Sequence, residues 1–294
     1  MRTVAPILAC LLLAGVSGSA QTDLRSELLR LLNAERQRVG APPLHLSPAL
    51  SRAAEEHAAE IAARGSSQLR AGSTEAMRQR LKRVGYEAHS WTERLAATPD
   101  DPPVLLRDWR QGDPESYRRI LASEVRDLGI GLDRLRGTPL YVFLFAVPQG
   151  DYFARGTSGL RDLERVRAEM LARVNDARKK TGVAPLRSNA RLDQAAQRHA
   201  EDMLDRSYFA HESPEKKTVR ERAHEAGYDW RAIGENLAEG QFSVDEVMDT
   251  WLRSPGHRRN ILDPDFKELG VGLALGRSGE SYRVVWTQAF GTNR

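Results

Sequence analysis

The chain has 294 residues, of which 40% are hydrophobic and 29% are charged, and its formal net charge at pH 7 is +4. This length accommodates two domains of ordinary size, and the composition is typical of water-soluble globular proteins. The small positive charge does not require a polyanionic partner, and the sequence contains no basic tail or nucleic-acid-binding motif. We therefore expect no nucleic-acid partner.

The first residues have the pattern of a secretory signal peptide. Arg2 supplies a positive charge, Val4–Val16 is a short apolar run, and Gly18–Ala20 offers small residues for cleavage. The run is too short to span a bilayer, and no later run is apolar enough to do so. The one cysteine, Cys10, lies inside this run rather than after it, which argues against a lipid anchor. We predict a signal peptide over residues 1–20, an extracytoplasmic, secreted protein without disulfides, and no stable membrane span; a membrane-retained N-terminus is the alternative.

Apolar periodicity and turn residues predict the elements of the first half of the chain. Ser47 as N-cap and Pro48 as the first helical residue mark the start of one helix, and Gly40 marks the end of the helix before it. The predicted helices and strands are Asp23–Val39, Pro48–Arg64, Thr74–Val84, Val104–Arg110, and then the strands Leu128–Leu132 and Leu140–Val147.

The same order of residues recurs in the second half. Asn33–Arg36 aligns with Asn175–Arg178 at an offset of 142 residues. After one inserted residue, Leu128–Gly131 aligns with Leu269–Gly272. The chain is therefore a tandem duplication, with two strands in each copy too close in sequence for a crossover helix. This predicts an α+β fold in which an antiparallel sheet is flanked by helices. The predicted bounds are a first domain at 22–150, a linker at 151–159 and a second domain at 160–294.

Candidate ligands in the second copy come from three separate segments. His211 follows the second predicted helix of that copy, and Glu235 follows the third. Ser254 and His257 lie in a Ser-Pro-Gly-His corner, whose proline and glycine would aim the imidazole. Two imidazoles and a carboxylate that converge suit a divalent cation such as zinc, with water or a hydroxyl completing the shell.

The ordered motifs of the second copy resemble the CAP superfamily, also called the SCP or pathogenesis-related-1 group, and in particular its bacterial secreted members without disulfides. The resemblance covers Leu160–Gly291 and rests, besides the N-x-x-R helix, on F-A-H-E-S-P at Phe209–Pro214, G-E-N-L at Gly234–Leu237, W-L-R-S-P-G-H-R-R-N-I-L at Trp251–Leu262, E-L-G-V-G at Glu268–Gly272 and V-W-T-Q-A-F-G at Val285–Gly291.

The resemblance implies a three-layer α-β-α sandwich in each copy, with a central cavity that presents two histidines and two acidic residues. His211 and His257 match the histidines, and Glu235 matches the first acid. Ser254 stands where the second acid is usual, which predicts a weaker, less anionic ligand cavity formed by these four residues.

Each of these residues also has a structural interpretation. Glu235 could cap a loop or form a salt bridge in it. The remaining polar and aromatic residues of the motifs are interpreted as structural: backbone-bonding asparagines, a helix-face histidine, a solvent-facing histidine and two core tryptophans, namely Asn236, Asn260, His199, His224, Trp251 and Trp286.

The first copy lacks most of the candidate site. Leu69 stands in the place of His211, and Ser116 stands in the place of His257, so that only Glu93 remains. We therefore expect a degenerate copy without a metal or acid–base site, which serves as a scaffold or an interaction surface.

The resemblance implies an exported binding module for a small ligand, a lipid or a cell-surface component. Zn²⁺ or another divalent cation is the possible cofactor, on His211, His257 and Glu235. The alternative is a metal-assisted hydrolase in which Glu235 is the general base and the cation sits on the two histidines. A serine nucleophile, Ser254 with His257, is a third hypothesis, disfavoured because no oxyanion donor is evident. The sequence leaves enzymatic activity and oligomeric state open.

Overall fold

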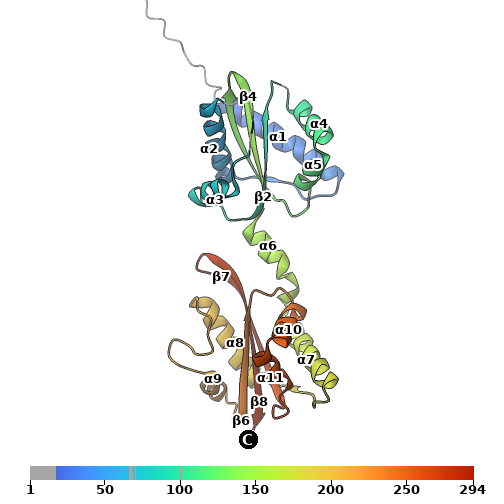
Figure 1. The fold of residues 1–294 in the computed structure, drawn as a ribbon, viewed down its shortest axis with the longest axis vertical. Helices are drawn as coiled ribbons and strands as arrows, with labels where there is room; N and C mark the ends of the chain where they lie inside the picture. Colours follow the sequence, from blue (N-terminus) through green and yellow to red (C-terminus); the bar gives the residue numbers. More distant parts are fainter. Residues whose placement is uncertain (1–17, 66–68, 70, 100) are drawn as a thin grey trace, which may run out of the picture. The chain divides into compact units, whose positions relative to one another are not determined.

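A computed structural model describes residues 18–65, 69, 71–99 and 101–294 (Figure 1). The predicted signal peptide therefore lies outside the described residues, except for Gly18–Ala20 at the start of the first helix. Contacts divide the chain into two compact units, Met1–Tyr152 and Phe153–Arg294. Within the described ranges, no helix is both long and apolar enough to cross a membrane.

The two units contain the same elements in the same order. In the first unit these are α1 (Gly18–Arg38), β1 (His45–Leu46), α2 (Pro48–Arg64), α3 (Thr74–Arg83), β2 (Ala88–Ala97), α4 (Pro102–Gly112), α5 (Pro114–Ile120), β3 (Asp127–Leu135), β4 (Thr138–Pro148) and the connecting helix α6 (Gln149–Gly156). In the second they are the short 3-10 helix η1 (Ser158–Leu160), α7 (Leu163–Lys180), β5 (Arg187–Ser188), α8 (Ala190–Asp205), α9 (Val219–Glu225), β6 (Trp230–Glu239), α10 (Val244–Arg253), α11 (Pro255–Leu262), β7 (Glu268–Ser278) and β8 (Ser281–Asn293).

Each unit contains one four-stranded sheet, in the order β1-β3-β4-β2 and β5-β7-β8-β6. The three long strands of each sheet are antiparallel, as predicted, whereas the two-residue edge strands β1 and β5 run parallel to their neighbours. The strands β2 and β6 were not predicted from the sequence. The α+β class is confirmed, and the sheet is larger than the sequence indicated.

Helices cover both faces of each sheet, as Figure 1 shows. In β4, Tyr141, Phe143 and Phe145 pack against α1, α4 and α5. The alternating residues Leu140 and Val142 pack against α2 and α3 on the opposite face. Successive side chains of a strand point to opposite faces of the sheet. The nearly continuous apolar sequence of β4 therefore contributes side chains to the cores on both faces. In the second unit, β8 likewise faces α7, α10 and α11 on one side and α8 and α9 on the other. Each unit is therefore a three-layer α-β-α sandwich.

Most of the segment predicted as a linker, residues 151–159, is helical. Helix α6 continues from β4 through Gly156, and η1 follows it. The helical structure of this segment was not predicted. Phe153 of α6 is buried in the second unit, with its ring centroid 4.9 Å from that of Tyr282. Tertiary packing of one aromatic residue thus outweighs the weak helix propensity of the glycines.

The Asn-x-x-Arg motif fastens the first long helix of each unit to the loops around it. Asn175 exchanges two hydrogen bonds with the backbone of Leu186, and Asn33 does the same with Leu44. Arg178 is fully buried and donates to the carbonyl oxygens of Ala184, Ile261, Asp263 and Phe266 at 2.6–3.2 Å. Arg36 makes the equivalent bonds in the first unit, to the carbonyl oxygens of Pro42, Ile120, Ala122 and Val125. The repeated motif is therefore structural.

The repeated Leu-Gly-x-Gly motif allows a helix to lie directly on the sheet. A Cβ atom at Gly129 or Gly131 would lie 2.4 Å from the carbonyl carbon of Leu50 or 2.2 Å from the carbonyl oxygen of Ala54, both in α2. In the second unit, Cβ atoms at the equivalent glycines of β7 would meet the backbone of α8 at 2.1–2.3 Å. Backbone atoms cannot yield as a flexible side chain can, so glycine is required at these positions.

We predict that Gly131→Ala destabilises the first unit by about 1–3 kcal/mol, because the added methyl group must push α2 away from β3. Chemical denaturation followed by circular dichroism measures the loss. Gly112→Ala is the matched control, since a Cβ atom there meets nothing within 4 Å and its φ is not positive. Equal stability of the two variants would contradict the close-packing argument.

Candidate functional site

His211 and Glu235 form the centre of the candidate site in the second unit. His211 lies in the loop between α8 and α9, and Glu235 lies on β6. Nδ1 of His211 is 2.8 Å from Oε1 of Glu235. The imidazole is 61% exposed, whereas the carboxylate is only 4% exposed. A buried carboxylate therefore orients an imidazole whose other ring nitrogen is directed away from this bond.

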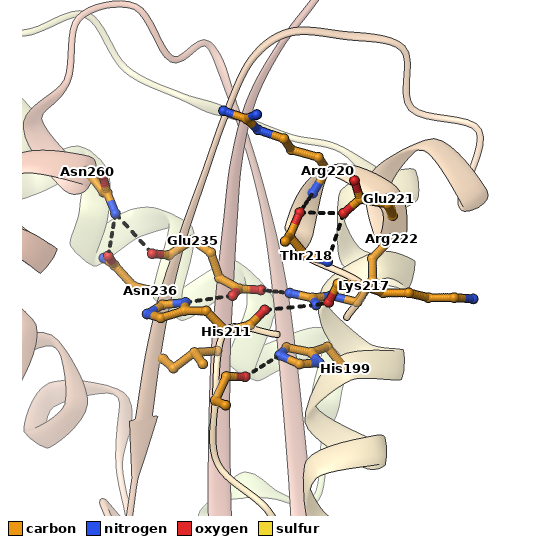
Figure 2. Close-up of polar contacts among 12 residues, drawn as sticks. His199, His211, Lys217, Thr218, Arg220, Glu221, Arg222, Glu235, Asn236 and Asn260 are labelled. Atoms are coloured by element: carbon orange, nitrogen blue, oxygen red, sulfur yellow. Dashed lines mark hydrogen bonds and ion pairs between the residues drawn. The ribbon is translucent and has the colours of Figure 1, made fainter. Parts of the chain in front are cut away.

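Arg222 of α9 completes this arrangement, as Figure 2 shows. Its Nη2 donates to Oε2 of Glu235, and its Nη1 donates to the carbonyl oxygens of His211 and Lys217 at 3.1 and 2.8 Å. Both oxygens of Glu235 are thus hydrogen-bonded, and the loop that carries His211 is tied to α9. Arg222 was missed in the sequence, although the offset of 142 residues pairs it with Arg80.

His257 comes to the site from α11, the short helix that begins at Pro255. Its Nδ1 is buried and has no hydrogen-bond partner among the described residues. Asn236 of β6 donates to the carbonyl oxygen of His257 at 3.1 Å, and Asn260 donates to the carbonyl oxygen of Glu235 at 3.0 Å and to Oδ1 of Asn236 at 2.9 Å. The two asparagines therefore hold α11 against β6, which confirms their structural interpretation.

The two histidines of the site have opposite pKa shifts. The hydrogen bond to Glu235 raises the pKa of His211, against the opposing effect of burial. Burial lowers the pKa of His257, and the charge of His211 lowers it further. At a pH between the two pKa values, His211 is protonated and His257 is neutral. Such a pair can offer one donor cation and one neutral nitrogen to the same ligand.

His199 supports the loop that carries His211. It lies on α8, is 1% exposed and has its Nε2 3.0 Å from the carbonyl oxygen of Ala210 (Figure 2). Burial lowers its pKa, which keeps the ring neutral. A cavity of 270 Å³ is lined by His199, Arg222 and Lys217 among others, but its described lining includes neither His211 nor His257. The structural interpretation of His199 is confirmed, and this cavity is distinct from the histidine site.

The other residues singled out in the motifs occupy structural positions. Trp251 and Trp286 are fully buried in the core, and their indole nitrogens donate to backbone carbonyls. His224 is exposed on α9. Ser254 ends α10 and begins α11 without a side-chain capping bond, and no described interaction joins its hydroxyl to the histidines.

The donor set for a metal ion is smaller than the sequence suggested. Glu235 already accepts from His211 and Arg222, which leaves the two imidazoles as the available ligands. Across the described ranges, no group of three or more His, Cys, Asp or Glu side chains is arranged to hold a metal ion. A buried carboxylate bonded to an imidazole is nevertheless the arrangement that orients metal-binding histidines in proteins. An ion at this site would have the two imidazoles as its protein ligands, with Glu235 as a positioning residue.

The first unit retains an acid–base pair, contrary to our expectation. Nδ1 of His57 is 2.6 Å from Oε1 of Glu93, and both side chains are buried, with exposures of 1% and 6%. The backbone nitrogen of Gly72 donates to the other oxygen of Glu93 at 3.1 Å. Leu69 indeed replaces the loop histidine, but the helix histidine His57 takes its place on the glutamate. The expectation missed this pair because it considered only the positions equivalent to His211 and His257, whereas His57 reaches Glu93 from α2.

The family model described as "CAP: Cysteine-rich secretory protein family" matches residues 29–145 and 171–290, one segment in each unit. The chain is 34% identical over 134 residues to "Uncharacterized protein YkwD" of Bacillus subtilis (strain 168), which covers 46% of this chain and 50% of that protein. It is 33% identical over 105 residues to "Uncharacterized membrane protein YlbC" of the same strain, covering 36% of this chain and 30% of that protein. The chain thus matches half or less of the length of these curated relatives.

Similar solved structures include an extracellular protein containing a SCP domain from Bacillus anthracis str. Ames, at 21% identity and a TM-score of 0.40, with 56% of each chain covered. They also include an outer surface protein from Borrelia burgdorferi, at 20% identity and a TM-score of 0.38, with 43% of this chain and 92% of that chain covered. Because the family model matches most of the chain, once in each unit, the protein belongs to the CAP family and contains two copies of its domain.

Proposed function

We propose that the chain is an exported CAP-domain protein that binds a small ligand, a lipid or a cell-surface component through His211 and His257 of its second unit. The observation that carries this proposal is the exposed imidazole of His211, which is hydrogen-bonded to the buried carboxylate of Glu235 and whose charge acts on the half-buried His257. Polar groups that are fixed in place before a ligand arrives lower the entropic cost of binding. In this proposal residues 22–150 and 160–294 are the two domains.

A divalent cation such as Zn²⁺ would be held by His211 and His257, with Glu235 and Arg222 fixing the orientation of the first imidazole. The ion would supply a positive centre for an oxygen atom of the ligand. Two imidazoles without a third protein ligand support weak binding, and both must be neutral to coordinate. The raised pKa of His211 means that protons compete with the ion in the neutral range.

Binding is favoured over hydrolysis because Glu235 is poorly accessible to water. A general base must accept a proton from water, whereas this carboxylate is only 4% exposed and each of its oxygens already has a partner, His211 or Arg222. The serine alternative lacks support as well, since no described hydrogen bond joins Ser254 to His257. The arrangement orients a histidine for recognition and leaves no evident nucleophile.

We predict that His211 titrates above the ordinary histidine value of about 6.5 and that His257 titrates below it, as followed by NMR. A raised pKa in the folded state stabilises the fold fully below about pH 6.5, and this contribution is lost as the pH rises through the folded value. Glu235→Gln should therefore cost more stability at about pH 5.5 than at about pH 8.5.

Glu235→Gln also weakens the interaction with Arg222, and this loss of stability is present at both pH values. Only the change in the stability loss between the two pH values therefore reports on His211. Glu215→Gln is the control, since Glu215 lies in the same loop but bonds Arg206 and Ser213 rather than His211. A stability difference between wild type and Glu235→Gln that does not change with pH would contradict the coupling of Glu235 to His211.

We predict that the full chain binds Zn²⁺ weakly at about pH 7.5 and loses this binding at about pH 5.5, on either side of the ordinary histidine pKa of about 6.5. Isothermal titration calorimetry should show no binding in the His211→Ala/His257→Ala double variant. Glu235→Gln should reduce the affinity about 10- to 100-fold, as expected when the partner of a ligating imidazole is removed. His224→Ala, an exposed histidine of the same unit, is the control. Unchanged binding in the double variant would refute the site.

We predict that the exported protein begins near Gln21, because Gly18–Ala20 supplies the small residues that a signal peptidase requires. N-terminal sequencing of protein recovered from the culture medium or the cell envelope tests this expectation. Recovery of an intact Met1 terminus from the membrane fraction would contradict export by cleavage.

A further inference from the structure

Arg80 of the first unit is a buried cation whose hydrogen-bonding capacity is only partly used. Its side chain is 4% exposed, and its Nη2 donates to Oε2 of Glu60 at 2.6 Å. Its Nε and Nη1 are buried and have no partner among the described residues. Leaving donors of a buried charged group unpaired carries a desolvation cost that no hydrogen bond offsets. The equivalent residue of the second unit, Arg222, donates to a carboxylate and two carbonyl oxygens instead.

The partner that Arg80 lacks is the glutamate of the neighbouring strand. In the second unit that glutamate, Glu235, accepts from Arg222. In the first unit Glu93 accepts from His57 and from the backbone of Gly72. The exchange of partners leaves Arg80 with Glu60, which is 40% exposed and also bonds Arg64. The Nε and Nη1 groups of this buried guanidinium are thereby left without an acceptor among the described residues.

A cavity of 370 Å³ is lined in part by Arg80. Its described lining includes three arginines and one glutamate, Arg64, Arg80, Arg83 and Glu60, together with His57 and Gly72. This excess of positive charge favours an anion. The volume is at the lower end of the range for small-molecule sites, which is about 300–1,000 Å³.

Gly72 lines this cavity without a side chain of its own. A Cβ atom at Gly72 would lie 3.1 Å from Nη1 of Arg80 and 3.7 Å from Nε2 of His57. The φ of Gly72 is not in the left-handed region, so the backbone itself does not require glycine here. A methyl group at Gly72 would therefore crowd the guanidinium of Arg80, whereas glycine places no side-chain atom beside Nη1.

We propose that the first unit binds a small oxyanion, a carboxylate or phosphate group, between Arg80, His57 and Gly72. Guanidinium groups form strong, charge-assisted hydrogen bonds with both kinds of oxyanion. Nδ1 of His57 is committed to Glu93, which directs Nε2 to the ligand side. The copy without the loop histidine is then a second binding domain of different chemistry.

The test titrates the full chain with inorganic phosphate and, separately, with acetate. The Nε–H signal of Arg80 is followed by NMR, and the affinity is measured by calorimetry. At least one anion should bind saturably and shift this signal. Binding of phosphate alone, of acetate alone or of both then shows which oxyanion the cavity accepts.

Two variants and one control make the test specific. Arg80→Gln should lower the affinity at least tenfold. Gly72→Ala should do the same with the guanidinium still present, because its methyl group fills the space beside Nη1. Arg78→Gln changes a 62% exposed arginine of the same helix, paired with Glu75, and should bind as wild type does. Circular dichroism checks the fold of each variant.

No saturable binding of either anion would overturn the proposal. Wild-type affinity in folded Gly72→Ala would also overturn it, and so would equal losses in Arg78→Gln and Arg80→Gln, which would indicate an adventitious ion attracted by surface charge. Because every variant lies in the first unit, these outcomes are independent of the histidine site of the second unit.

Discussion

A buried guanidinium that donates only to backbone carbonyls holds each unit together. Arg178 reaches from α7 to the turn behind it, to the end of α11 and to the chain that enters β7. Burial lowers the pKa of Arg178, but an arginine remains charged at any ordinary pH. Carbonyl oxygens without this cation would be left unsatisfied in the interior. The placement of α11, and with it of His257, therefore depends on this residue.

Close contact between helix and sheet is the second constraint that both units share. The glycines of β3 and β7 allow α2 and α8 to lie with their backbones against the sheet. The same helices carry His57 and His199, whose rings are consequently buried at the sheet surface. In the first unit the loop has no histidine, and His57 of α2 is close enough to β2 to bind Glu93 instead.

The two units thus use one scaffold for two patterns of polar bonding. Each contains a histidine, an arginine and a glutamate at equivalent positions, with His57, Arg80 and Glu93 corresponding to His199, Arg222 and Glu235. In the second unit the arginine and the loop histidine share the glutamate. In the first unit His57 of α2 is hydrogen-bonded to Glu93, and Arg80 donates to Glu60. The two units also differ in the loop residue, which is Leu69 in the first and His211 in the second. Both units nevertheless have cores on both faces of their sheets.

The sequence by itself determined the duplication, the α+β class and the helices with strong apolar periodicity, and it singled out His211, Glu235 and His257 as candidates in the second unit. Repeated motifs, capping residues and the period of the apolar pattern are local features that one chain displays without a fold. It did not reveal β6, whose polar residues Arg231 and Glu235 interrupt the strand pattern, nor the helix that Phe153 anchors. Only the tertiary structure decided which histidine and which arginine each glutamate binds. These partners lie 13 to 36 residues away in sequence, and buried charges pair according to distances set by packing, which no local pattern encodes.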